Sequence, residues 1–126
     1  RPQRWLPAIV LTVAVLGLIL TESILAARGT VEILYPGQGG QVSGLVEVYG
    51  TATDENLSYY QLEYSRYGRE WKPIGPPHYN RPVVKGTLGV WDTSQIPPAS
   101  YQLRLTLTDR MGNVIQHTIA VTVGDS

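Results

Sequence analysis

The feature that most constrains this chain is an apolar run near its start. The run covers residues 5–27, begins at Trp5 and meets its first charged residue at Glu22. It is apolar on every side, whereas an amphipathic helix would place polar residues at a spacing near 3.6. About 23 helical residues extend roughly 34 Å, which is enough to cross a hydrocarbon core of about 30 Å. The run therefore predicts one transmembrane helix.

The charges at the two ends of this run predict its orientation. Arg1 and Arg4 precede it and only Arg28 follows it, so the positive-inside tendency places the N-terminus in the cytoplasm. Residues 1–28 are then a short cytoplasmic segment with a helix at about 5–27 in the cytoplasmic membrane, and residues 29–126 form an extracytoplasmic domain. The alternative is a cleaved secretory signal ending at the small residues Ala26 and Ala27, but the run is long for such a signal.

Small residues predict that the helix packs against a neighbour. Ala14, Gly17 and Thr21 share one helical face through their spacing of three and four residues. Membrane helices pack closely at such faces, since lipid gives them no hydrophobic drive to associate. The expected partners are the lipid bilayer and other membrane-protein subunits.

After Gly29 the pattern changes to the alternation of β-strands. Val31, Ile33 and Tyr35 are expected on one side of a first strand, and the odd positions of residues 101–108 are expected to face the core. Several prolines between Pro76 and Pro82 exclude a central strand there, and the chain is expected to resume as a strand at Thr87. This indicates an all-β domain, an antiparallel β-sandwich of about seven strands of immunoglobulin (Ig) or fibronectin type III character. The expected strands are 31–35, 45–52, 58–66, 71–74, 87–91, 101–108 and 114–123.

Several segments of the domain also carry a family resemblance. These segments are residues 42–52, 60–64 with Trp71, 86–93, 101–105 and 109–113. Together they resemble bacterial Ig-like domains appended to penicillin-binding proteins and other envelope proteins, notably in filamentous phototrophic bacteria. The resemblance covers about residues 30–124 and implies a sandwich fold in the cell envelope. These 126 residues differ from those proteins in containing no transglycosylase or transpeptidase domain, so the resemblance implies a fold and a location and not an enzymatic activity.

Composition and motifs favour a binding role without catalysis or a cofactor. Lys and Arg balance Asp and Glu, so a nucleic-acid partner is not expected, and there is no cysteine for a thiolate metal site. No serine lies in a recognisable nucleophile motif. His117 is expected as a hydrogen-bonded residue facing the core. The loops 54–56 and 109–113 are expected at one end of the sandwich, the position of a calcium site in some domains, but they lack the dense acidic pattern that calcium needs.

Aromatic residues indicate where the domain binds. Trp91 and Tyr101 are expected to fill the core, and Tyr101 to form a tyrosine corner. A second set is expected on loops and outer faces, where such rings anchor interfaces: Tyr59, Tyr67, Trp71 and Tyr79. The leading hypothesis is an accessory subunit of a larger membrane complex, for which the resemblance suggests photosynthetic or respiratory electron transfer. The alternative is an envelope module that binds peptidoglycan or another glycan.

Overall fold

The domain is a two-layer β-sandwich whose sheets contain three and five strands. The structure, a computed structural model, describes residues 29–124. One sheet has the order β1-β3-β6 and the other β2-β8-β7-β4-β5. The first contains β1 (Thr30–Tyr35), β3 (Leu45–Thr53) and β6 (Val83–Asp92). The second contains β2 (Gln41–Val42), β8 (Val114–Val123), β7 (Ala99–Asp109), β4 (Leu57–Ser65) and β5 (Lys72–Pro73).

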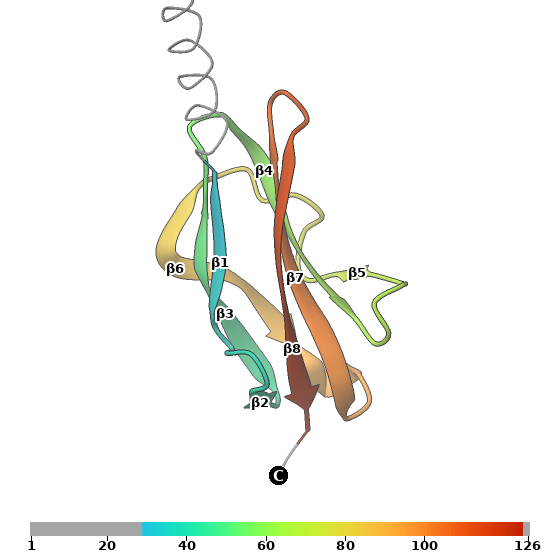
Figure 1. The fold of residues 1–126 in the computed structure, drawn as a ribbon. Helices are drawn as coiled ribbons and strands as arrows, with labels where there is room; N and C mark the ends of the chain where they lie inside the picture. The colour runs from blue at the N-terminus through green and yellow to red at the C-terminus, as the bar shows by residue number, and fades with distance from the viewer. Residues whose placement is uncertain (1–28, 125–126) are drawn as a thin grey trace, which may run out of the picture.

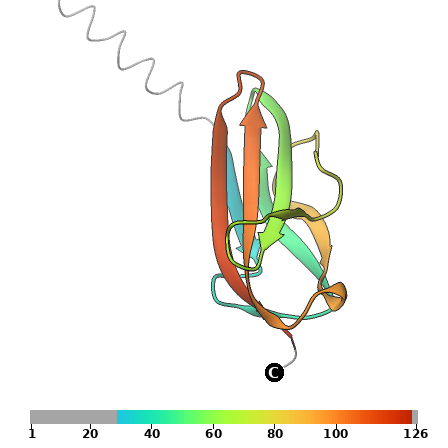
Figure 2. The same ribbon diagram turned by 90° about the vertical axis from the view of Figure 1, so that its right-hand side faces the viewer.

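The two sheets face each other across one core (Figures 1 and 2). In Figure 2, β8, β7 and β4 lie side by side in front of β1 and β3. Neighbouring strands pair antiparallel except β2 and β8, which pair parallel at Gln41 with Thr122 and Val42 with Val123. The antiparallel all-β sandwich predicted from the alternation is therefore confirmed, with one short parallel pairing added.

The core consists of the inward positions that the alternation predicted. On β7, Leu103, Leu105 and Leu107 are at most 1% exposed, and Trp91 and Tyr101 are buried as expected. Such alternation is what a sheet with one face on the core and one in solvent requires. The alternation of apolar residues in the sequence thus correctly predicted which face of β7 lies in the core.

Two local expectations were wrong. Tyr35 was expected on the same side as Ile33, but Ile33 is buried and Tyr35 is 53% exposed, because the register shifts between them and turns the end of β1 outward. The strand expected at Thr87 begins earlier, at Val83, directly after the last proline of the loop. A proline has no backbone N–H to donate to a neighbouring strand. The residue after it still has its own N–H, so the strand can begin there.

His117 links the two sheets. Its Nδ1 accepts a hydrogen bond of 2.8 Å from the backbone N–H of Ile33. Ile33 lies on β1, at the edge of the three-stranded sheet, whereas His117 lies on β8 of the other sheet. The prediction of a hydrogen-bonded histidine facing the core is confirmed, and the bond gives an edge N–H a partner.

Within residues 29–124, no helix has both the length and the apolar character needed to cross a membrane. The helix predicted at residues 5–27, with its packing face of Ala14, Gly17 and Thr21, lies outside the described residues.

Candidate functional site

A groove opens beside the β4–β5 turn, between that turn and the segment that leads into β7. It encloses about 690 Å³. We call it the β4–β5 groove. Its lining combines aromatic, apolar and charged side chains: Tyr64, Ser65, Arg66, Tyr67, Arg69, Glu70, Lys72, Ile96, Pro97 and Tyr101. Concave sites with apolar walls and a few polar groups are the usual form of a binding site.

The aromatic floor of the groove is formed by Tyr64 and Tyr101, which both pack on the buried Trp91. The ring of Trp91 lies 5.3 Å from that of Tyr64 and 6.3 Å from that of Tyr101, the latter edge to face. The hydroxyl of Tyr101 donates a 2.7 Å hydrogen bond to the carbonyl of Pro97, which is the tyrosine-corner geometry expected from the sequence. Burial raises the pKa of Tyr101, so its hydroxyl stays protonated and keeps donating.

Replacing Tyr101 with phenylalanine is expected to lower the free energy of unfolding by about 1 kcal/mol. The change removes one hydrogen bond to Pro97 and leaves the ring packing on Trp91 in place. Urea unfolding followed by tryptophan fluorescence measures the loss. Tyr49→Phe is the matched control, because Tyr49 is 37% exposed. Equal stabilities of the two variants would contradict a structural role for the Tyr101 hydroxyl.

The rim of the groove presents one exposed ring between two guanidinium groups. Tyr67 is 68% exposed, and Arg66 and Arg69 lie 4.7 Å and 6.0 Å from its ring centroid. Arg66 is itself held by a 2.9 Å hydrogen bond from Nη1 to the carbonyl of Ser100. Cation–π contact and this hydrogen bond restrain the rim, so less freedom is lost when a ligand binds.

The turn that carries the rim has a fixed shape. Ser65 is buried, and its Oγ accepts a 2.8 Å hydrogen bond from the backbone N–H of Gly68. Gly68 has a φ of 78°, a left-handed conformation that glycine adopts without the steric cost of a Cβ. The turn therefore holds Tyr67 outward at its apex.

The groove is positively charged although the whole chain is neutral. Arg66, Arg69 and Lys72 line it together with one carboxylate, Glu70, whereas the chain carries no net charge. The local excess is two positive charges. A cleft with an excess of one sign of charge attracts ligands of the other sign, so the groove suits an acidic segment.

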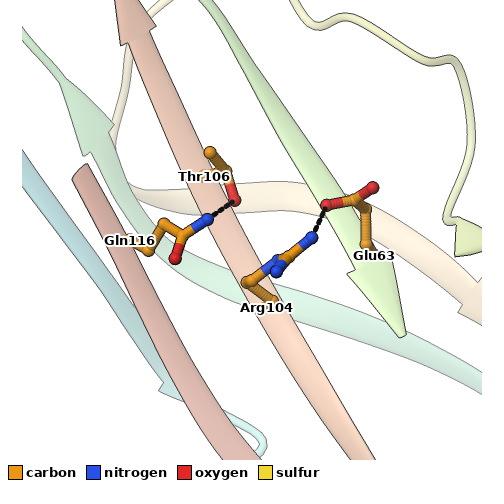
Figure 3. Close-up of polar contacts among 4 residues, drawn as sticks. All are labelled: Glu63, Arg104, Thr106 and Gln116. Atoms are coloured by element: carbon orange, nitrogen blue, oxygen red, sulfur yellow. Dashed lines mark hydrogen bonds and ion pairs between the residues drawn. The ribbon is translucent and has the colours of Figure 1, made fainter. Parts of the chain in front are cut away.

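The outer face of the five-stranded sheet carries polar side chains that interact with one another (Figure 3). Arg104 forms a 2.8 Å ion pair with Glu63, and Gln116 donates to Thr106 at 3.3 Å. The guanidinium of Arg104 also lies 3.8 Å above the ring of Trp71. One face of Trp71 is therefore covered by an intramolecular cation.

The four aromatic residues predicted to bind fall into two pairs. Tyr67 lines the groove, and Trp71 lies next to the groove residues Glu70 and Lys72. Tyr59 lies farther back on β4, and Tyr79 lies in the loop before β6, where its backbone pairs with that of Tyr60 on β4.

Within the second pair, both rings are engaged in the fold. Tyr59 stacks on His78 at 3.8 Å, and Tyr79 stacks on Tyr60 at 4.7 Å. The hydroxyl of Tyr79 donates to the carbonyl of Ile74 at 3.0 Å, and burial raises the pKa of Tyr79. Burial, with Tyr79 nearby, raises the pKa of Tyr60 to about 12. This pair supports the packing of the loop on β4.

The loops considered for calcium do meet at one end of the sandwich, as expected. The N–H of Arg110 donates to the carbonyl of Asn56 at 2.9 Å. Their carboxylates are occupied by the protein, since Asp54 accepts from the N–H of Asn56 and Asp109 from those of Met111 and Asn113. Residues 29–124 contain no group of three or more His, Cys, Asp or Glu side chains placed to hold a metal ion.

Sequence reasoning missed most of the groove. It did not predict a binding role for the three cations of the groove, Arg66, Arg69 and Lys72. These cations are interspersed with aromatic residues in one short segment between two strands. That clustering of cations and rings in a turn was the available signal. Ile96 and Pro97 carry no such signal, because only the fold brings them opposite the turn.

The fold and the groove together define a two-layer β-sandwich domain with an open, basic groove. No family model matches the chain, and no curated protein matches it. Among solved structures, the endo-β-1,4-mannanase from Thermotoga petrophila is similar, with 17% identity and a TM-score of 0.54 over 79% of this chain. A double mutant of the Cellulomonas fimi endo-β-1,4-mannanase has 18% identity and a TM-score of 0.43 over 75% of this chain. The matches span 20% and 18% of the two mannanase chains, and the first of them indicates a shared fold.

Proposed function

We propose that this chain is a non-catalytic accessory subunit of a larger membrane complex. In this proposal residues 5–27 cross the cytoplasmic membrane, with Ala14, Gly17 and Thr21 facing another subunit. The sandwich then docks an acidic segment of a partner protein on the extracytoplasmic side. The observation that carries the proposal is the β4–β5 groove, with its aromatic floor, exposed Tyr67 and excess of positive charge.

The residue types in the groove are those that dominate protein interfaces. Tyrosine and arginine are enriched among residues whose truncation weakens binding most. Tyr67 offers a large ring that is already restrained by Arg66 and Arg69. A protein segment carrying carboxylates and an apolar side chain would satisfy both the cations and the aromatic floor.

The same proposal places the domain in the Ig-like or fibronectin type III-like class. Two features support this: the three-stranded sheet against a larger sheet, and the Tyr101 hydroxyl bonded to Pro97. The Trp91 ring packed on Tyr101 fits the same class. Domains of this class commonly act as binding modules, and their function depends on the site that they carry.

Reversing the charge of the rim tests the docking role. In the full chain, Arg66→Glu combined with Arg69→Glu is expected to reduce co-purification with the complex about tenfold or more, because unpaired interface charges typically cost 2 to 5 kcal/mol. Gentle detergent extraction followed by size and mass analysis gives the readout. Arg81→Glu with Lys85→Glu is the charge-matched control, since both residues are exposed and neither lines the groove.

Two results would count against the proposal. Migration of the wild-type chain only as a free monomer would remove the accessory-subunit role. Equal co-purification of the rim and control variants would show that docking does not use the groove.

A glycan-binding role is the second candidate function. It is favoured by the exposed ring of Tyr67 beside the polar groups of Arg69 and Glu70, since such rings stack on sugars while charged groups bond hydroxyls. Retention on purified peptidoglycan that is lost in Tyr67→Ala would support it. Failure of the wild-type chain to bind purified cell wall would reject it.

A further inference from the structure

The loop joining β7 and β8 holds a large apolar side chain out in solvent. Met111 is 80% exposed, and Val114 and Ile115 beside it are 54% and 36% exposed. The loop has a fixed shape, because Asp109 Oδ1 accepts from the N–H groups of Met111 and Asn113 at 2.8 and 2.9 Å. Hydrogen bonding to Asn113 lowers the pKa of Asp109, so these bonds persist at neutral pH. Met111 is thus presented by a defined loop.

This loop lies at the end of the sandwich where β1 begins (Figure 1). Thr30 pairs with Thr53, Leu57 pairs with Asp109, and the N–H of Arg110 bonds the carbonyl of Asn56. The backbone of Gly29 lies against the same end, since a Cβ there would be 2.7 Å from Cδ1 of Ile115. The start of the described chain and the β7–β8 loop therefore share one end.

The apolar run ends close to this point in the sequence. Only two residue steps separate Ala27, its last residue, from Gly29, and two residues extend about 7 Å at most. If the run crosses a membrane, as proposed above, the lipid headgroups lie next to Gly29. The same headgroups then face Met111, Val114 and Arg110.

We propose that the β7–β8 loop is a membrane-contact surface of the domain. Met111 and Val114 enter the boundary between headgroups and acyl chains, and the exposed side chain of Arg110 reaches lipid phosphates. Apolar side chains beside a cation are the usual composition of such interfacial contacts. The contact fixes the domain upright, with the β4–β5 groove directed away from the membrane, because β4 runs from Leu57 beside this loop to Ser65 at the groove.

The absence of cysteine makes a direct test possible. In the full chain, Met111→Cys or Gln95→Cys is labelled with an environment-sensitive fluorophore and reconstituted into phosphatidylcholine–phosphatidylglycerol vesicles. Gln95 is exposed and lies beside Ile96 of the groove, remote from the β7–β8 loop. A nitroxide carried on the lipid headgroups is expected to quench the label at position 111 several-fold more than the label at position 95, with a blue-shifted emission only at position 111.

The inference rests on the proposed membrane anchor, and the test separates the two. Failure of the labelled chains to float with the vesicles would overturn the anchor and this contact with it. Flotation with equally weak quenching at both positions would overturn the contact alone and leave the anchor standing. Unchanged urea unfolding of both variants shows that the label reports on position and not on misfolding.

Discussion

Replacing Leu105 with alanine is expected to lower the free energy of unfolding by about 3 to 4 kcal/mol, as for other fully buried leucines. Leu105 is 0% exposed and lies on β7, the central strand of the five-stranded sheet, between Leu62 on β4 and His117 on β8. The truncation removes buried apolar surface and leaves a cavity. The neighbouring strands β4 and β8 are both hydrogen-bonded to β7, so they cannot move in to fill this cavity. Domains of this size are stable by only about 5 to 15 kcal/mol, so the loss is a large fraction of the total.

Leu45→Ala is the matched control for this change. Leu45 is 73% exposed on β3, so the same truncation is expected to change stability by less than about 0.5 kcal/mol. Urea unfolding monitored by tryptophan fluorescence compares the two variants. A similar loss in both would mean that the inward face of β7 is assigned incorrectly.

Replacing Gly50 with alanine is expected to destabilise the domain by about 2 to 3 kcal/mol through overpacking. A Cβ at Gly50 would lie 2.0 Å from the carbonyl oxygen of Glu32 on the neighbouring β1. That oxygen belongs to the backbone, so the contact can be relieved only if β1 moves away from β3. The N–H of Ile33, bonded to His117, would move with it.

Gly37→Ala separates this close approach from the general effect of removing a glycine. A Cβ at Gly37 would meet no atom within 4 Å, so the change is expected to stay within about 1 kcal/mol of the wild type. Amide hydrogen exchange gives a second readout, with faster exchange expected across β1 in Gly50→Ala. Unaltered exchange in β1 would refute the proposed displacement.

The alternation of apolar residues was sufficient to predict most of the long strands and the inner face of β7, but it did not predict β2. On β7 the odd positions from Tyr101 to Leu107 are buried, as their period of two requires. The turn residues between strands and the prolines before Val83 also carried reliable local information, because their backbone restrictions act within a few residues.

The pattern was less informative where strands deviate from regular pairing. Tyr35 follows the alternation in the sequence but is exposed, since the pairing of β1 with β3 shifts by one residue before it. A shift of this kind depends on how the partner strand is placed. Tyr79 likewise reads as a loop aromatic, although its pairing with Tyr60 carries it onto the core edge.

The candidate site also combines features that the sequence alone predicts with features that depend on the tertiary structure. By itself the sequence determined an apolar run, a set of alternating strands, the core aromatics and a turn rich in cations and tyrosine, all of which are properties of neighbouring residues. Only the tertiary structure decided that this turn lies opposite Ile96 and Pro97 to form a groove, and that Met111 shares an end with Gly29. Those contacts join segments distant along the chain, and they depend on sheet order and strand length, which no local pattern of side chains encodes.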